Sequence, residues 1–185
     1  MQSALFFLLN TLTDLCILGF LLRFLLHWVK ADLYNPLSQL ILKFTNPLIL
    51  PARRFLPSLA QIDVPTLIVL IGLESLATWL LLGISNLDPG FSRFIVLVLM
   101  RLALLTLTFY TVSIFIYVIS SWIGQGTSSP IARILFDLNE PILQRFRRIL
   151  PPIGGIDLSP LAALLLIQAL NIAIQSNGNF PRYLL

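Results

Sequence analysis

Four long apolar stretches divide the sequence, and more polar segments separate them. A bilayer core of about 30 Å takes about 20 helical residues to cross, so stretches of this length predict membrane-spanning helices. The fourth is short and is interrupted by Gln168 and Asn171. We therefore expect an all-α membrane protein with four transmembrane helices, at about residues 4–29, 64–84, 94–122 and 158–175.

Amphipathic segments fill the two long connections, at residues 35–57 and 129–151. Apolar residues recur there at i, i+3, i+4 and i+7, as on one face of a helix. Because they are too short and too charged to span, we expect them to lie in the membrane interface. Each loop should form two short helices that begin where a capping residue precedes proline, at Asn35-Pro36, Asn46-Pro47, Ser129-Pro130 and Glu140-Pro141. Pro57 and Pro151 should end the loop helices.

The second half of the chain repeats rare residues of the first half at a fixed offset of 94 residues. Apolar matches would mean little here, but matches of Trp, Pro, Arg and Asp indicate an internal duplication. The aligned pairs are Trp28 with Trp122, Pro36 with Pro130, Pro47 with Pro141, Arg53-Arg54 with Arg147-Arg148, and Asp63 with Asp157. We predict two repeat units, residues 1–90 and 91–185. Each unit would cross the membrane twice, so the repeats would be parallel.

Basic residues are concentrated in the two long connections. Eight of the twelve Lys and Arg residues lie there, whereas residues 85–92 contain only Asp88 as a charged group. The positive-inside rule then places both long loops in the cytoplasm and both termini in the periplasm of a bacterial inner-membrane protein. The N-terminus lacks a basic region and a small-residue cleavage site, so we expect it to belong to the mature chain.

Composition supports a membrane protein and excludes several other classes. The chain is 57% hydrophobic and only 11% charged, whereas a soluble domain is about a quarter charged. A single cysteine, Cys16, excludes an intramolecular disulfide framework. The net charge of +4 is distributed beside apolar segments, so it favours an anionic lipid surface over nucleic acid as partner.

Basic residues of the loops are the first candidate site. At headgroup depth each charge gains about 1 kcal/mol near anionic lipid. These residues either anchor the loops and set the topology, or form a paired platform for lipid headgroups, a membrane-protein partner or a second copy of the chain. Asp63 and Asp157 precede spans and are expected to cap them. The lipid- or partner-binding candidates are Arg53, Arg54, Arg147, Arg148, Lys43 and Arg133.

Ionisable residues inside the predicted spans are the second candidate site, because such residues are costly and face other helices or water. Arg23 is close enough to the cytoplasmic end to extend to the headgroups. By depth, Arg101 is the available cation for Asp14 and a candidate partner for Glu74. Two interpretations remain open: a structural ion pair, and a proton or cation pathway through the two acids. The repeat does not duplicate these charges, since Asp14 aligns with Thr108, Glu74 with Gln168 and Arg101 with Phe7.

The sequence shows no arrangement of residues that would support catalysis. His27 is the only histidine, and Gly154-Gly155 is expected to be a turn. We find no phosphate-binding loop, no cluster with metal-ligand spacing and no nucleophile–base pair. We therefore expect a non-enzymatic protein with no cofactor.

The duplicated unit resembles the YggT family of bacterial and plastid membrane proteins. The residues that carry the resemblance are Leu22-Arg23, Trp28, residues 32–36, residues 47–57, residues 124–126 and residues 141–160. It implies an association with osmotic tolerance and potassium or cation uptake for the proteobacterial form, with division in Gram-positive relatives, and with cytochrome assembly and nucleoid distribution in plastids. It supplies no catalytic residue.

Two functions are therefore expected. In the first, the protein organises or modulates membrane assemblies through its paired cytoplasmic loops. In the second, it takes part in osmotic or potassium and cation homeostasis, with an ion path near Asp14 and Glu74.

Overall fold

The protein is all-helical in the residues that the structure, a computed structural model, describes: 2–55, 62–85, 87–122, 129–150 and 157–176. Six α-helices lie in these ranges. They are α1 (Gln2–Trp28), α2 (Pro36–Phe55), α3 (Val64–Ile84), α4 (Phe91–Trp122), α5 (Pro130–Ile149) and α6 (Ser159–Gln175).

Three of these helices are long and apolar enough to cross a membrane. Among the described residues they are Ala4–Trp28 in α1, Val64–Ile84 in α3 and Phe91–Ser121 in α4, with mean hydropathies of 2.1, 2.2 and 2.2. Continuous runs of Leu, Ile, Val and Phe favour this state, since a helix satisfies its own backbone hydrogen bonds in lipid. α6 is also apolar but has 17 residues, which corresponds to a length of about 26 Å.

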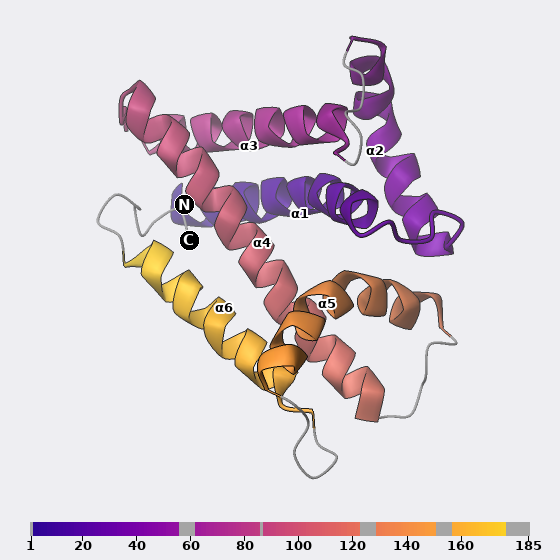
Figure 1. Cartoon of the computed structure of the whole chain (residues 1–185). Helices are drawn as coiled ribbons and strands as arrows, with labels where there is room; N and C mark the ends of the chain where they lie inside the picture. The colour runs from indigo at the N-terminus through magenta and orange to yellow at the C-terminus, as the bar shows by residue number, and fades with distance from the viewer. Residues whose placement is uncertain (1, 56–61, 86, 123–128, 151–156, 177–185) are drawn as a thin grey trace.

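The long helices form two packed pairs. α1 lies beside α3, α6 lies along α4, and α4 crosses the first pair (Figure 1). α2 contacts both α1 and α3, and α5 contacts both α4 and α6. The two loop helices lie at the end of the bundle opposite the start of α1 and the end of α6 (Figure 1).

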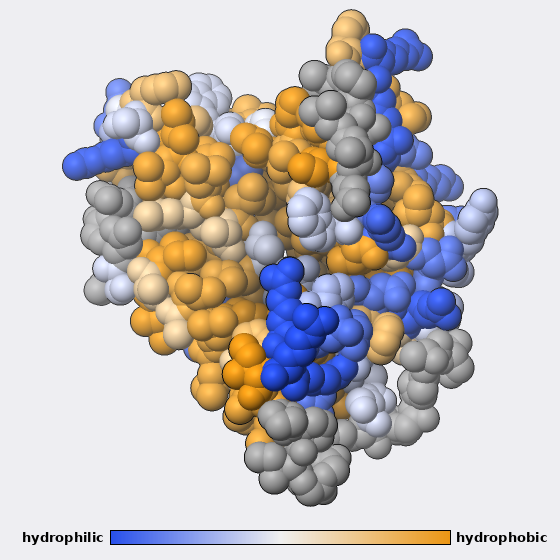
Figure 2. Space-filling view, in the orientation of Figure 1, coloured by the Kyte–Doolittle hydropathy of each residue, from blue (hydrophilic) through white to orange (hydrophobic). Residues whose placement is uncertain are grey.

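Hydrophilic side chains gather over α2 and α5, whereas the flank formed by the long helices is mainly hydrophobic in the view of Figure 2. Leu15 in α1 and Leu165 in α6 are each 65% exposed, and comparable leucines follow along both helices. Apolar side chains exposed on this scale are typical of a surface that contacts lipid or another protein. The surface therefore agrees with the composition of the chain.

Each loop forms one helix, and the prediction of two short helices per loop was wrong. α2 and α5 have 20 residues each, with Pro47 and Pro141 inside them. Proline removes one helical hydrogen bond, which usually bends a helix. Buried residues on both sides of each proline hold the two halves against the bundle, including Thr45 and Ile49 in α2. Packing thus outweighs the local signal to start a new helix.

The predicted starts of the two loop helices are confirmed. Asn35 Oδ1 accepts a hydrogen bond from the Leu37 N–H at 3.0 Å, and Ser129 Oγ accepts one from the Ala132 N–H at 3.1 Å. Each cap satisfies one of the free N–H groups of a helix N-terminus. The expected ends at Pro57 and Pro151, and the turn at Gly154-Gly155, lie outside the described residues.

The main core joins α1, α2 and α3. Phe20 and Leu26 of α1, Ile49 of α2 and Leu70 of α3 are almost fully buried in it. α2 approaches α1 closely at Gly19, where an added Cβ would lie 3.0 Å from a ring carbon of Phe44. Ile134 and Leu138 of α5 reach the same core, and a separate cluster of Ile114, Leu143, Ala163 and Ile167 joins α4, α5 and α6.

Candidate functional site

A buried charge cluster joins α1, α3 and α4 inside the bundle. We use this name for Asn10, Asp14, Glu74, Thr78 and Arg101. Arg101 donates from Nε to Glu74 Oε1 at 2.7 Å, from one terminal nitrogen to Asn10 Oδ1 at 2.9 Å, and from the other to Asp14 Oδ1 at 2.8 Å. Thr78 donates to Glu74 Oε1 at 3.2 Å. Both acids therefore pair with Arg101, as their depth along the spans predicts.

The buried charge cluster contains more negative than positive groups. Glu74 and Arg101 have side chains that are 1% and 4% exposed, whereas the side chain of Asp14 is 34% exposed. Glu74 Oε2 is buried and has no hydrogen-bond partner among the described residues. Two carboxylates facing one guanidinium in a low-dielectric interior leave one negative charge unbalanced, and an added proton or a monovalent cation would balance it.

The buried charge cluster also explains why these charges are not duplicated. Its two acids come from the first predicted unit, on α1 and α3, and its arginine comes from the second, on α4. It therefore joins the two halves of the chain and does not belong to either. A contact between the two halves needs opposite charges on its two sides. The residues at the equivalent positions, 94 residues apart, therefore need not be the same.

Sequence reasoning missed Asn10 and Thr78, because only ionisable residues were selected within the spans. A usable signal was present. Asn10 precedes Asp14 by four residues and Thr78 follows Glu74 by four, so each lies on the same helix face as its acid.

Each loop helix also makes an ion pair with the residue that leads into the next helix. A terminal nitrogen of Arg53 lies 2.8 Å from Asp63 Oδ2, and Nε of Arg147 lies 2.7 Å from Asp157 Oδ2. We call these the junction ion pairs. Both are ten residues apart in the sequence and occupy equivalent repeat positions. Two of the six arginines and lysines expected to bind lipid therefore already hold a carboxylate.

The two acids of the junction ion pairs were expected to cap the helices that follow, and this prediction was wrong for Asp63, whose side chain makes no cap hydrogen bond. Burial raises the pKa of Asp63, but hydrogen bonds from Thr66 and Arg53 outweigh it and hold that pKa below its ordinary value. Asp63 precedes α3 without a side-chain bond to a helix N–H. Asp157 does accept the Ser159 N–H at 2.9 Å, and its pKa is likewise lowered, because this contact and Arg147 outweigh burial.

The other predicted loop residues face outward. Lys43 and Arg54 on α2 and Arg133 and Arg148 on α5 are all exposed. They extend from two helices that approach each other, since Asn35 Nδ2 donates to the Pro130 carbonyl at 2.8 Å. The arrangement can present several positive charges to one membrane surface.

Arg23 does not extend to the headgroups, and that prediction was wrong. The residue is 4% exposed, and one of its terminal nitrogens donates to Thr45 Oγ1 at 2.7 Å and to Asn46 Oδ1 at 2.8 Å. Nε has no partner in the part of the chain that the structure describes. The reason is that α2 packs against α1 and covers the side chain, and Thr45 and Asn46 bind the nitrogen that was expected to extend outward.

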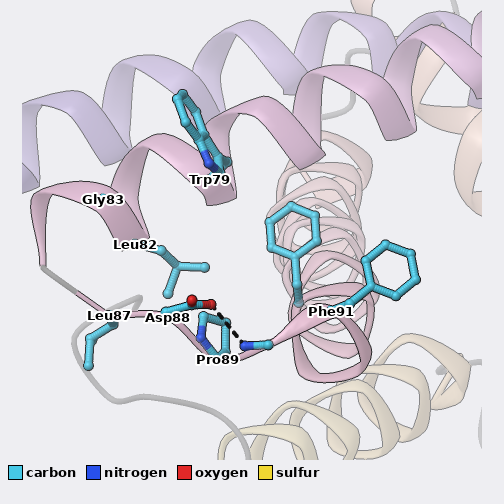
Figure 3. A pocket seen from close by; sticks show the side chains of 9 residues that line it. Trp79, Leu82, Gly83, Leu87, Asp88, Pro89 and Phe91 are labelled. Carbon is cyan, nitrogen blue, oxygen red and sulfur yellow. Dashed lines mark hydrogen bonds between the residues drawn. The ribbon is translucent and has the colours of Figure 1, made fainter.

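A hollow of about 490 Å³ lies where α3 leads into α4. Its walls are mainly apolar, and Trp79, Leu82 and Phe91 lie around it (Figure 3). Asp88 is its acidic residue, and Asp88 Oδ1 accepts the Gly90 N–H at 3.1 Å, which shapes the turn. Among the described residues, no group of three or more His, Cys, Asp or Glu side chains could hold a metal ion.

Comparison with known proteins gives several relatives that align along almost the whole chain. The chain is 35% identical over 182 residues to "Uncharacterized protein YggT" of Escherichia coli K12, covering 96% of this chain and 95% of the relative. It is 34% identical over 179 residues to "Uncharacterized protein PA0392" of Pseudomonas aeruginosa, covering 96% and 91%. It is 41% identical over 176 residues to a Vibrio alginolyticus protein, covering 92% of each.

No solved structure matches the chain. The family model described as CCB3/YggT matches it twice, at residues 2–84 and at residues 96–177. These two segments include all six helices of the described residues almost completely. The chain therefore belongs to the CCB3/YggT family.

Proposed function

We propose that this chain is a non-enzymatic, four-span protein of the bacterial inner membrane that organises or modulates membrane assemblies through its two loop helices. α6 would be the fourth span. It packs along α4 as α3 packs along α1, and its length of about 26 Å is close to the thickness of a bilayer core. The two matches to one family model support two parallel units.

The observation that carries the proposal is the position of the exposed basic residues. Lys43, Arg54, Arg133 and Arg148 are exposed on α2 and α5, and these two helices lie at one end of the bundle (Figure 1). On α2, Leu40 and Phe44 are 66% and 55% exposed, which suits insertion among acyl chains. A helix with one apolar and one basic exposed face is held in the interface by both kinds of contact.

The basic surface would recruit anionic headgroups and, through them or directly, another membrane protein or a second copy of this chain. By the positive-inside rule this surface is cytoplasmic and the chain ends are periplasmic. The electrostatic contribution would be about 1 kcal/mol for each basic residue near the surface. Four residues together give enough attraction to select a partner without any catalytic group.

The test is crosslinking in native membranes followed by identification of the crosslinked proteins. We expect defined products with the wild type and their loss when Lys43, Arg54, Arg133 and Arg148 are replaced by Ala. Arg93→Ala is the matched control, because Arg93 is exposed at the start of α4, at the other end of the bundle. Identical products from the fourfold variant and the wild type would overturn the proposal.

A second candidate function, in cation or osmotic homeostasis, is favoured by the buried charge cluster. Glu74 Oε2 lacks a hydrogen-bond partner among the described residues, and the cluster has one unbalanced negative charge. Such a site would bind H⁺ or a monovalent cation. Purified protein in liposomes should then pass K⁺, Na⁺ or H⁺ above the level of empty vesicles, and Glu74→Gln should abolish the flux. Equal flux with and without protein would exclude direct conduction.

A further inference from the structure

The two units differ most in chemistry at their junctions, the regions where each loop helix meets the two long helices of its unit. The junction of α1, α2 and α3 contains two guanidinium groups, Arg23 and Arg53, and one carboxylate, Asp63. The equivalent junction of α4, α5 and α6 contains one guanidinium group, Arg147, and two carboxylates. Duplication has therefore produced one junction with excess positive charge and one with excess negative charge.

We infer that the α1–α2–α3 junction is a binding site for an anionic phosphate group, and that the α4–α5–α6 junction is not. The inference deepens the proposed function and rests on it, because it places one specific ligand site within the basic loop surface. The ligand chemistry is a phosphate oxyanion, which either a phospholipid headgroup or free phosphate can supply.

The first part of the argument is the unsatisfied buried donor at this junction. Arg23 Nε is buried and has no hydrogen-bond partner in the described parts of the chain. The residue as a whole is only 4% exposed. Thr45 and Asn46 are uncharged, so their two hydrogen bonds to Arg23 leave its charge without a direct counter-ion. A buried, hydrogen-bonded but uncompensated guanidinium is costly, and a phosphate oxygen is one of its best partners.

The second part is the electrostatic environment of Arg23. Arg53 and Asp63 are the charged groups that act on Arg23 at this junction, so one carboxylate faces two guanidinium groups. Asp63 Oδ2 accepts from Arg53 at 2.8 Å and from Thr66 at 2.7 Å, whereas Oδ1 is buried without a hydrogen-bond partner among the described residues. The carboxylate therefore balances one guanidinium group and cannot balance both.

The third part is the exposure of the basic side chains at the edge of this junction. The Arg53 side chain is 46% exposed, and its neighbour Arg54 is exposed as well. An anion that binds Arg53 at the surface therefore lies at the edge of the junction, within the field of the buried Arg23. If α1 and α3 span the membrane, the junction lies where their cytoplasmic ends meet the headgroups, which is the depth of the lipid phosphates.

At the α4–α5–α6 junction, carboxylates of the chain itself neutralise the arginine. Glu140 replaces Asn46 and Tyr117 replaces Arg23 in the repeat register. Arg147 then donates to Glu140 at 2.7 Å and to Asp157 at 2.7 Å. Two substitutions thus remove the excess guanidinium and supply an internal carboxylate, so no site for an external anion remains.

The experiment measures the unfolding temperature of the full chain in a neutral detergent as a function of added ligand. The probes are short-chain phosphatidylglycerol, inorganic phosphate and, as the zwitterionic reference, short-chain phosphatidylcholine. A ligand that binds only the folded protein raises this temperature in a concentration-dependent way. We expect half-maximal stabilisation by phosphatidylglycerol at a concentration at least tenfold lower than by phosphatidylcholine. Stabilisation by inorganic phosphate would support the site with free phosphate as the source, and its absence would support the headgroup.

The decisive variant is Asn46→Glu, which copies the second junction without removing Arg23. It should weaken the response to phosphatidylglycerol at least tenfold and keep the ligand-free unfolding temperature at or above that of the wild type. Gln144→Glu is the matched control, since it adds the same charge at an exposed position of α5, and it should leave the response within about twofold. Glu140→Asn should strengthen the response by freeing Arg147.

The outcomes separate the site from the broader proposal. If Asn46→Glu and Gln144→Glu weaken the response equally, the junction site is wrong and only a diffuse basic surface remains. If the wild type does not distinguish phosphatidylglycerol from phosphatidylcholine, both the site and the lipid-binding surface are wrong. If Asn46→Glu alone weakens the response, the site is supported.

Discussion

Replacing Arg101 by Leu should destabilise the protein far more than neutralising either of its acidic partners. Arg101 contacts Asp14 at 2.8 Å on α1 and Glu74 at 2.7 Å on α3. Its loss leaves two carboxylates inside the bundle without a cation. Loss of Glu74 or Asp14 alone leaves one carboxylate facing one guanidinium, which is a balanced pair.

The magnitude follows from the burial of these groups. Removing one partner of a buried ion pair costs about 3–5 kcal/mol, and the side chains of Glu74 and Arg101 are 1% and 4% exposed. For a chain of this size 1 kcal/mol shifts the unfolding temperature by about 2–4 °C. We therefore expect Arg101→Leu to lower it by about 6–20 °C, and Glu74→Gln or Asp14→Asn to lower it by less than about 3 °C, since one balanced pair remains.

The assay is thermal unfolding of the purified variants in one detergent, at one protein concentration and near neutral pH. The triple variant Asp14→Leu, Glu74→Leu and Arg101→Leu is the control for packing. Replacing a whole buried ionic group by apolar side chains is often neutral or stabilising, so this variant should recover most of the stability lost in Arg101→Leu. The reasoning is refuted if Arg101→Leu unfolds within about 2 °C of the wild type, or if Glu74→Gln is equally damaging.

Three further predictions concern the loop helices. Because the pKa of Asp63 is lowered, its pairing with Arg53 stabilises the fold fully when the pH is above the ordinary carboxyl pKa. This stabilisation is lost as the pH falls through the lowered pKa. Asp63→Asn should therefore flatten the acid side of a plot of unfolding temperature against pH, and an unchanged slope would contradict the assignment. Ser129→Ala removes the cap of α5 and should lower stability by about 1 kcal/mol. The measurement is unfolding in a denaturing detergent, with Ser92→Ala, a change at an exposed serine of α4, as control. Gly19→Leu should displace the ring of Phe44, which lies 3.0 Å from the position of a new Cβ, and a cysteine crosslink between α1 and α2 should form more slowly in this variant than in Gly19→Ala.

The long helices could be predicted from sequence because each depends on a local property. α3 occupies Val64–Ile84, the range expected from its apolar run, and α1, α4 and α6 differ from expectation only at their ends. The loops were harder. The cap-and-proline signals at Asn46-Pro47 and Glu140-Pro141 are real local preferences, but buried neighbours such as Ile49 and Leu143 keep each loop helix continuous.

The buried charge cluster was predictable in part. The cost of charge in lipid singled out Asp14, Glu74 and Arg101, and comparison of their depths suggested the pairing. The same reasoning failed for Arg23, because depth along a helix says nothing about what covers it. The side chain is enclosed by α2, through Thr45 and Asn46. The sequence marked Asn46 only as a helix-capping residue, and it gave no sign that either residue would bind Arg23.

The sequence by itself predicted the long apolar helices, the positions at which each loop helix begins and the residues that carry charge into the bundle. These properties depend on continuous composition or on local motifs, and both can be read along the chain. Only the tertiary structure decided which groups meet those charges. Arg23 bonds to a residue 22 positions away and Arg101 to one 91 positions away, and these separations are closed by the packing of whole helices. The two junctions acquire opposite charge for the same reason, since their partners come from different helices.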